Sequence, residues 1–229
     1  MTVASPFTFK WPFTWEDRHP VYQQGVFFLP DFYDKHDRVL LPSFGEIFGN
    51  SAPICIEYCS GNGAWILEKA SQRPECNWVA VEIRFDRARK IWKKAAKAGL
   101  KNVLVVLGEG VTFSKHYLDR ASVSEIFVNF PDPWPKDRHA KHRIIQSPFV
   151  QEMARIVAAS GKMTLVTDDS TYAEQMRQVT LGSNLWNSLL PEPFYTHEME
   201  GYGTSYFREL WESKAKSIFF HQFSPRYVL

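Results

Sequence analysis

The chain has 229 residues, 45% of them hydrophobic, which is enough to bury a sizeable core in one domain. No apolar run approaches the roughly 18 residues that a membrane-spanning helix needs, and residues 1–17 lack the basic start and apolar core of an export signal. Cys55, Cys59 and Cys76 form no Cys-x-x-Cys pair, so we expect buried thiols and no metal site. The composition predicts a cytoplasmic protein with neither a membrane nor a metal partner.

Charge is distributed unevenly along the chain, although the net charge is only +2. Residues 84–101 carry eight Lys or Arg and one acid, and residues 136–143 carry four Lys or Arg and one acid. The remainder of the chain has a net charge of −8. Two basic runs are typical of a face that binds a polyanion, although a solvated helix face explains either run alone equally well.

Residues 1–50 are rich in aromatic residues and proline but show no sustained hydrophobic period. This pattern predicts that residues 1–50 form an N-terminal arm with a short helix, which packs on a main domain at residues 51–229.

From residue 54 onward, short apolar runs alternate with segments long enough for a helix. This rhythm predicts a Rossmann-like α/β fold, with a mostly parallel sheet and helices on both faces. The predicted parallel strands are Ile54–Cys59, Trp78–Ile83, Val103–Leu107, Glu125–Phe130 and Lys162–Thr167. A C-terminal antiparallel pair is expected at Phe194–Met199 and Ser217–Phe223.

The sequence pattern predicts where two of the intervening helices begin and end. In Asp86–Gly99, alanines, Ile91 and Trp92 recur at helical spacing, and lysines occupy another face. Thr171 and Glu174 fit a capping box that opens a helix ending near Gly182.

In an open parallel sheet, ligands bind beyond the carboxyl ends of the strands. Gly61 and Gly63 follow the first strand and allow a tight turn and close approach of a ligand, although an ordinary turn has the same pattern. The third glycine of a dinucleotide fingerprint is absent, because Ile66 stands there. Glu82 lies about twenty residues beyond the glycine turn, where a carboxylate can accept from both hydroxyls of a ribose. Glu109 follows the third strand and can accept from an adenine amino group. Either residue is also explained as a surface carboxylate.

The most specific motif is NFPDPWPKDRHAKHR, residues 129–143, after the fourth strand. Its three prolines restrict φ and should hold Asp132 and Trp134 in an extended loop with little entropy to lose on binding. The cations that follow are spaced to contact several phosphates, although a stiff surface loop with solvated charges has a similar composition. Asp168 and Asp169 end the fifth strand; one of them suits a helix N-cap, and Asp168 is the candidate for the site.

This motif, followed by VTDDSTYAEQM and GTSY, resembles the bacterial tRNA (guanine-N7-)-methyltransferases, over roughly residues 54–223. The resemblance implies a class I methyltransferase fold and transfer of a methyl group from S-adenosylmethionine to guanine N7 in tRNA, at position 46 in the variable loop. The expected partner is therefore tRNA, and the expected state is a monomer or a homodimer.

The resemblance also implies roles at matching positions. Asp132 would be the catalytic carboxylate, and the cofactor would lie against Glu57, Gly61, Gly63, Glu82, Glu109 and Asp132. The substrate would be contacted by Lys136, Asp168, Thr204 and Tyr206. The RNA would be contacted by Arg138, His139, Lys141, His142 and Arg143. Three residues depart from the family pattern: Cys59 replaces a glycine, Glu109 an aspartate and Phe207 a glutamate.

The implied chemistry makes few demands on side chains. Guanine N7 carries a lone pair and no proton, so methyl transfer needs orientation and no general base. A guanine taken out of its stack needs an aromatic platform, for which Trp134 and Tyr206 are candidates. The alternatives are a class I methyltransferase acting on another RNA base or a small molecule, and an RNA-binding module that has lost its cofactor.

Overall fold

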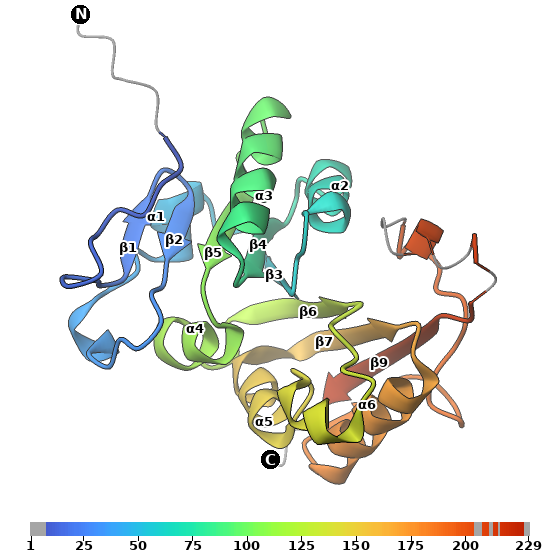
Figure 1. Cartoon of the computed structure of the whole chain (residues 1–229). Coiled ribbons are helices and arrows are strands. Elements are labelled where there is room, and N and C mark those ends of the chain that lie inside the picture. Colours follow the sequence, from blue (N-terminus) through green and yellow to red (C-terminus); the bar gives the residue numbers. More distant parts are fainter. Residues whose placement is uncertain (1–7, 204–207, 211–212, 215, 227–229) are drawn as a thin grey trace, which may run out of the picture.

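The computed structural model describes residues 8–203, 208–210, 213–214 and 216–226. Within them, strands join into one mixed sheet in the order β1-β2-β5-β4-β3-β6-β7-β9-β8 (Figure 1). The strands are β1 Val21–Gln23, β2 Val26–Phe28, β3 Ile54–Tyr58, β4 Asn77–Glu82, β5 Val103–Leu107, β6 Val123–Asn129, β7 Val157–Thr167, β8 Trp186–Ser188 and β9 Phe219–Pro225. The helices are α1 Phe44–Phe48, α2 Ala64–Gln72, α3 Phe85–Lys97, α4 Gly110–Tyr117, α5 Ser147–Ile156 and α6 Ser170–Gly182, with short 3-10 turns η1 His36–Arg38 and η2 Asp137–His142.

The five central strands, β5-β4-β3-β6-β7, are parallel and confirm the predicted sheet. Two apolar clusters sandwich it. Helices α2 and α3 cover one face through Trp65, Ile66 and Ile91, and α4, α5 and α6 cover the other through residues such as Phe113 and Phe149. The chain order reverses at β3 and β6, so the switch point lies between these two strands.

The C-terminal antiparallel strand is confirmed, but its predicted partner is wrong. Strand β9 pairs with β7 and with β8, whereas Phe194–Met199 contributes only a single bridge, from Thr196 to Phe220. The Thr196 hydroxyl donates to the Glu198 carbonyl at 3.0 Å and accepts from the Glu198 N–H at 3.3 Å. This local turn bends the backbone out of the ladder.

The N-terminal segment contributes to the sheet, which its sequence did not predict. Strand β2 is fully buried and pairs in parallel with β5, while the short helix expected in this segment is α1, opened by a Ser43–Glu46 capping box. Phe9 is buried against Phe28 and α3. The division of the chain at residue 50 stays a prediction.

The two predicted helices form close to their expected bounds. On α3, Ala88, Ile91 and Ala95 are buried, as the apolar stripe indicates. The predicted capping box of α6 is wrong, because the helix begins at Ser170 and the Asp169 carboxylate accepts the Tyr172 N–H at 2.7 Å. One of the two aspartates after β7 is thus a helix cap, as expected.

Candidate active site

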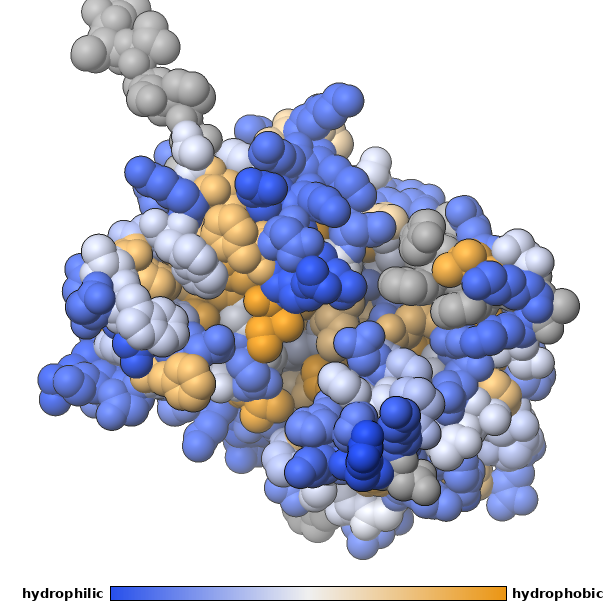
Figure 2. Space-filling model, viewed as in Figure 1, coloured by the Kyte–Doolittle hydropathy of each residue, from blue (hydrophilic) through white to orange (hydrophobic). Residues whose placement is uncertain are grey.

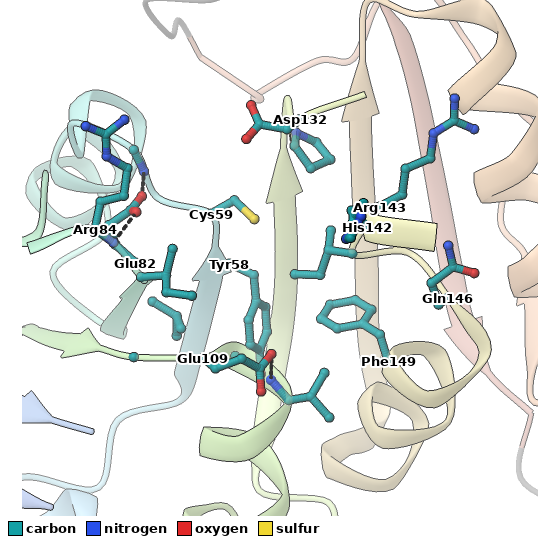
Figure 3. A pocket seen from close by; sticks show the side chains of 18 of the residues that line it. Tyr58, Cys59, Glu82, Arg84, Glu109, Asp132, His142, Arg143, Gln146 and Phe149 are labelled. Atoms are coloured by element: carbon teal, nitrogen blue, oxygen red, sulfur yellow. Dashed lines mark hydrogen bonds between the residues drawn. The ribbon is translucent and has the colours of Figure 1, made fainter. Parts of the chain in front are cut away.

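A cavity of about 540 Å³ opens beyond the carboxyl ends of the central strands, at the switch point. Its size suits a nucleoside-sized ligand. Figure 3 shows Glu82 and Arg84 on one side and His142, Gln146 and Phe149 on the other. Of the predicted site residues, the cavity wall brings together Gly61, Glu82, Glu109, Asp132, His142 and Arg143.

The turn after β3 keeps a glycine-like path although its first position is a cysteine. Cys59 has φ 59°, in the left-handed region, as do Gly61 at 58° and Gly63 at 73°. Gly61 lines the cavity. Gly63 does not, and a Cβ there would lie 2.8 Å from Ile91 of α3, so this glycine is required for helix packing.

Glu82, at the end of β4, ties this turn to α3. Its two carboxylate oxygens accept the N–H of Gly61 and the N–H of Arg84, each at 2.8 Å. Burial raises the pKa of Glu82 despite these bonds. Each oxygen keeps a further lone pair, so the carboxylate can still accept from ribose hydroxyls.

Glu109 lines the cavity and also caps α4. Its carboxylate accepts the N–H of Val111 at 2.9 Å, and the N–H and hydroxyl of Thr112 at 2.6 and 2.7 Å. These bonds satisfy the otherwise unpaired N–H groups at the start of the helix. Helix capping is therefore the role that the geometry shows for this residue.

Glu57 lies on the opposite face of β3 from Tyr58, because neighbouring residues of a strand alternate. Tyr58 lines the cavity and Glu57 does not. The Glu57 side chain is buried; Oε1 accepts from the Asn129 amide at 2.7 Å, and Oε2 has no partner among the described residues. Burial raises the pKa of Glu57 to about 8. An unpaired buried oxygen of this kind suits a cationic group.

A buried network that the sequence did not reveal continues from Glu57. The Tyr202 hydroxyl donates to Asn129 Oδ1 at 2.8 Å. On α2, Trp65 Nε1 donates to the Tyr202 carbonyl at 2.8 Å, and Lys69 Nζ to the Gly201 carbonyl at 2.7 Å. The network thus ties Gly201 and Tyr202, which lead into the predicted substrate segment, to α2 and to the ends of β3 and β6. The only sequence signal was the Gly-Tyr-Gly pattern, since Gly201 and Gly203 have φ 71° and 79°.

The loop after β6 presents Asp132 as expected. Asp132 is exposed at the cavity, and no hydrogen bond or ion pair joins it to any other described residue. The predicted extended course is wrong in part, because Phe130 and Trp134 have φ 47° and 43°. Two such residues within one loop store backbone strain, which is typical of functional sites.

Arg143 has a structural role in the loop that the sequence did not predict. Its side chain is buried at 6% exposure, and its guanidinium donates to the Pro133 carbonyl at 2.6 Å, to the Trp134 carbonyl and to Gln175. It also lies 4.9 Å from the ring of Tyr172. Three of the five N–H donors of the guanidinium are thus held within the protein, so Arg143 holds the loop in shape, and its predicted RNA contact stays a prediction.

Of the other predicted residues of this region, His142 lines the cavity, whereas Lys136, Arg138, His139 and Lys141 do not. Lys136, Arg138 and Lys141 are exposed. His139 and His142 flank the half-exposed Trp134 ring at 5.9 and 5.3 Å. Asp168 does not line the cavity, and its carboxylate accepts from Lys216 Nζ at 2.7 Å. Thr204, Tyr206 and Phe207 fall outside the described residues.

Several residues of the cavity wall were not predicted from the sequence. Arg84 and Arg87 extend from the N-cap and the first turn of α3, and Phe149 belongs to α5. The wall also includes the apolar residues Val111, Ile144, Pro148 and Phe149. The sequence did not single out these apolar residues, because apolar residues after a strand are equally expected in the hydrophobic core.

Metal and membrane features are absent from the part of the chain that the structure describes. No group of three or more His, Cys, Asp or Glu is arranged to hold a metal ion. None of the described helices is both long and apolar enough to cross a bilayer.

Comparison with known proteins identifies relatives across nearly the whole chain. A family model described as "Putative methyltransferase" matches residues 51–220. The tRNA (guanine-N(7)-)-methyltransferase of Chlamydia muridarum is 46% identical over 221 residues, which cover 96% of this chain and 98% of the relative. A protein of the same name in Rubrobacter xylanophilus is 30% identical over 188 residues, covering 80% of this chain and 82% of the relative.

Solved structures share the fold at lower sequence identity. The antibiotic-resistance methyltransferase Kmr matches with a TM-score of 0.55 at 15% identity, over 80% of this chain and 92% of that one. The 16S rRNA methyltransferase KamB matches with a TM-score of 0.54 at 17% identity, over 82% and 96%. The sheet, its switch-point cavity and the sequence relatives agree: this chain belongs to the tRNA (guanine-N(7)-)-methyltransferase family.

Proposed function

We propose that the protein transfers a methyl group from S-adenosylmethionine to N7 of a guanine in cytoplasmic tRNA, the guanine at position 46. The relatives' names support the reaction. The observation that carries the proposal is Asp132, a carboxylate at the cavity with no hydrogen-bond partner among the described residues, in a loop that Arg143 holds in shape.

The residues present fit S-adenosylmethionine, a nucleoside with a cationic methionine end. Glu82 retains acceptor capacity for a ribose beside the glycine turn. Glu57 has a buried oxygen with no partner among the described residues, which a cationic group would satisfy. We propose that Gly61, Glu82 and Glu109 hold the nucleoside end. Asp132 then faces the cationic end, whereas Glu57 does not line the cavity, so its contact with the cofactor stays a prediction.

When bound, S-adenosylmethionine supplies a methyl group activated by the positive charge of its sulfonium. The protein has to place guanine N7 in line with that methyl, and orientation of this kind contributes much of the rate. Positive charge develops on the guanine as N7 is methylated, and the Asp132 carboxylate stabilises it. In an alternative pose, the same oxygens accept from guanine N1–H and N2–H, a donor pair that adenine lacks. Trp134, flanked by two imidazoles, offers a face for the extruded base.

The test is the isosteric variant Asp132→Asn, assayed with tRNA and S-adenosylmethionine. Loss of the carboxylate should lower the rate of 7-methylguanosine formation by ~100-fold or more, with tRNA affinity nearly unchanged. Asp119→Asn, at an exposed aspartate that does not line the cavity, is the matched control. Equal loss of methylation and of tRNA binding in folded Asp132→Asn would contradict the assignment.

A further inference from the structure

Helix α3 carries more exposed positive charge than its packing requires. Its buried stripe consists of Ala88, Ile91 and Ala95. The exposed cations from its N-cap to its last residue are Arg84, Arg89, Lys90, Lys93, Lys94 and Lys97. Asp86 is the only acid in the helix, and it pairs with Arg84 at 3.3 Å.

Most of these cations have no acidic partner. Within the described residues, no ion pair joins Arg89, Lys90, Lys93 or Lys97 to a carboxylate, and Lys94 donates to the carbonyl of Asn62. Like charges three or four residues apart destabilise a helix by about 0.2–0.5 kcal/mol per pair. A face that carries this cost with no acidic partner among the described residues is typical of a surface that binds a polyanion.

The position of α3 connects this face to the active site. The helix starts shortly after β4, and Arg84 at its N-cap and Arg87 in its first turn line the cavity. Its 13 residues extend about 20 Å from there. Figure 2 shows hydrophilic side chains over α3, from the hollow in the middle of the molecule outward. This length spans several successive phosphates of one strand.

The loop at residues 136–143, on the other side of the cavity, has few cations that are free to bind phosphates. Arg143 is committed to the carbonyls of Pro133 and Trp134, which leaves Lys136, Arg138 and Lys141 as its exposed, permanently charged residues. Because affinity for RNA rests mainly on phosphate neutralisation, these residues alone provide a small footprint.

The N-terminal segment holds α3 in place. The Phe9 ring lies 5.1 Å from Phe85 and 5.7 Å from Trp92. The Trp11 ring lies 5.3 Å from Phe85, and Trp92 Nε1 donates to the Gln24 carbonyl at 3.0 Å. The arm therefore packs against the aromatic side of α3 and leaves its basic side exposed.

We propose that the exposed basic face of α3 is a second tRNA-binding surface, which starts at the cavity mouth and holds the phosphate backbone next to the methylated guanine. The proposal rests on the proposed function for the identity of the RNA. The residues 136–142 then bind the backbone on the opposite side of the cavity, so the guanine is presented between two basic surfaces.

The experiment compares two triple variants of the full chain by tRNA binding across a salt series. Lys90→Gln, Lys93→Gln and Lys97→Gln together remove three charges of α3 and keep good helix formers. The slope of log affinity against log salt should decrease by roughly 2 to 3, because each lost phosphate contact removes about 0.7 to 0.9. At low salt, tRNA affinity should fall at least tenfold. KM for tRNA should rise, and kcat at saturating tRNA should change little.

The matched control removes the same charge elsewhere, by Lys35→Gln, Lys115→Gln and Arg120→Gln, at exposed positions off α3. Calorimetry with S-adenosylmethionine checks that both variants keep their cofactor site. An unchanged salt slope in the α3 variant, or an equal loss in the control, would overturn the proposal. If the wild type makes no 7-methylguanosine, the proposed function fails, whereas the salt slopes still report separately on the α3 surface.

Discussion

Replacement of Glu57 by Gln should remove a pH dependence from the stability of the protein. The Glu57 carboxyl is buried, with its pKa raised from 4.5 to about 8. The folded state therefore favours the protonated acid, whereas the unfolded chain loses this proton above pH 4.5. Stability from this group is fully present below pH 4.5 and is lost as the pH rises toward 8.

The size of the effect follows from that shift. Each pH unit between the two pKa values corresponds to about 1.4 kcal/mol, so the wild type should lose about 3 to 4 kcal/mol relative to Glu57→Gln between pH 5 and pH 8. Glutamine keeps an oxygen for the Asn129 amide, which holds Glu57 Oε1 at 2.7 Å, and carries no titrating proton.

The assay is urea unfolding at several pH values between 5 and 8, without cofactor. Glu200→Gln, at an exposed carboxylate, is the control for loss of any acidic group. The wild-type and Glu57→Gln curves of unfolding free energy against pH should diverge steadily. Parallel curves would refute the reasoning, because they would show that Glu57 has the same pKa in the folded and unfolded chains.

Three further substitutions test individual contacts. Tyr202→Phe leaves the buried Asn129 Oδ1 without its donor, so the free energy of unfolding should fall by about 1–3 kcal/mol; urea unfolding with no change would exclude the network. Cys59→Gly relieves a left-handed residue and should raise thermal stability by up to about 1 kcal/mol, whereas a clear loss would mean that the turn needs the cysteine side chain. Arg143→Lys cannot reproduce the planar donor set, so hydrogen exchange in the loop should accelerate; unchanged exchange, with weaker tRNA binding, would restore Arg143 as an RNA contact.

The parallel core of the fold was predictable because its strands are apolar on both faces and separated by helices. Strands Val26–Phe28 and Trp186–Ser188 were not, since three residues are too few to show a period. Their place in the sheet depends on partners such as Val105 and Pro225, which are distant in the sequence.

Some site residues could be predicted from their position just after a strand, whereas others depend on tertiary packing. Asp132 and Glu82 reach the cavity because they stand at strand ends. Arg143 and Lys141 look equivalent in the sequence, but only the first meets carbonyls that bury it. The Tyr202 contact joins residues 73 positions apart, and no local pattern encodes such a pairing.

The most direct test of the central claim is mass analysis of nucleosides from unmodified tRNA incubated with the protein and methyl-labelled S-adenosylmethionine. The label should appear in 7-methylguanosine, and it should disappear when the guanine at position 46 of the tRNA is replaced by adenine. Label in another nucleoside, or no label in tRNA although the protein binds the cofactor, would contradict the account.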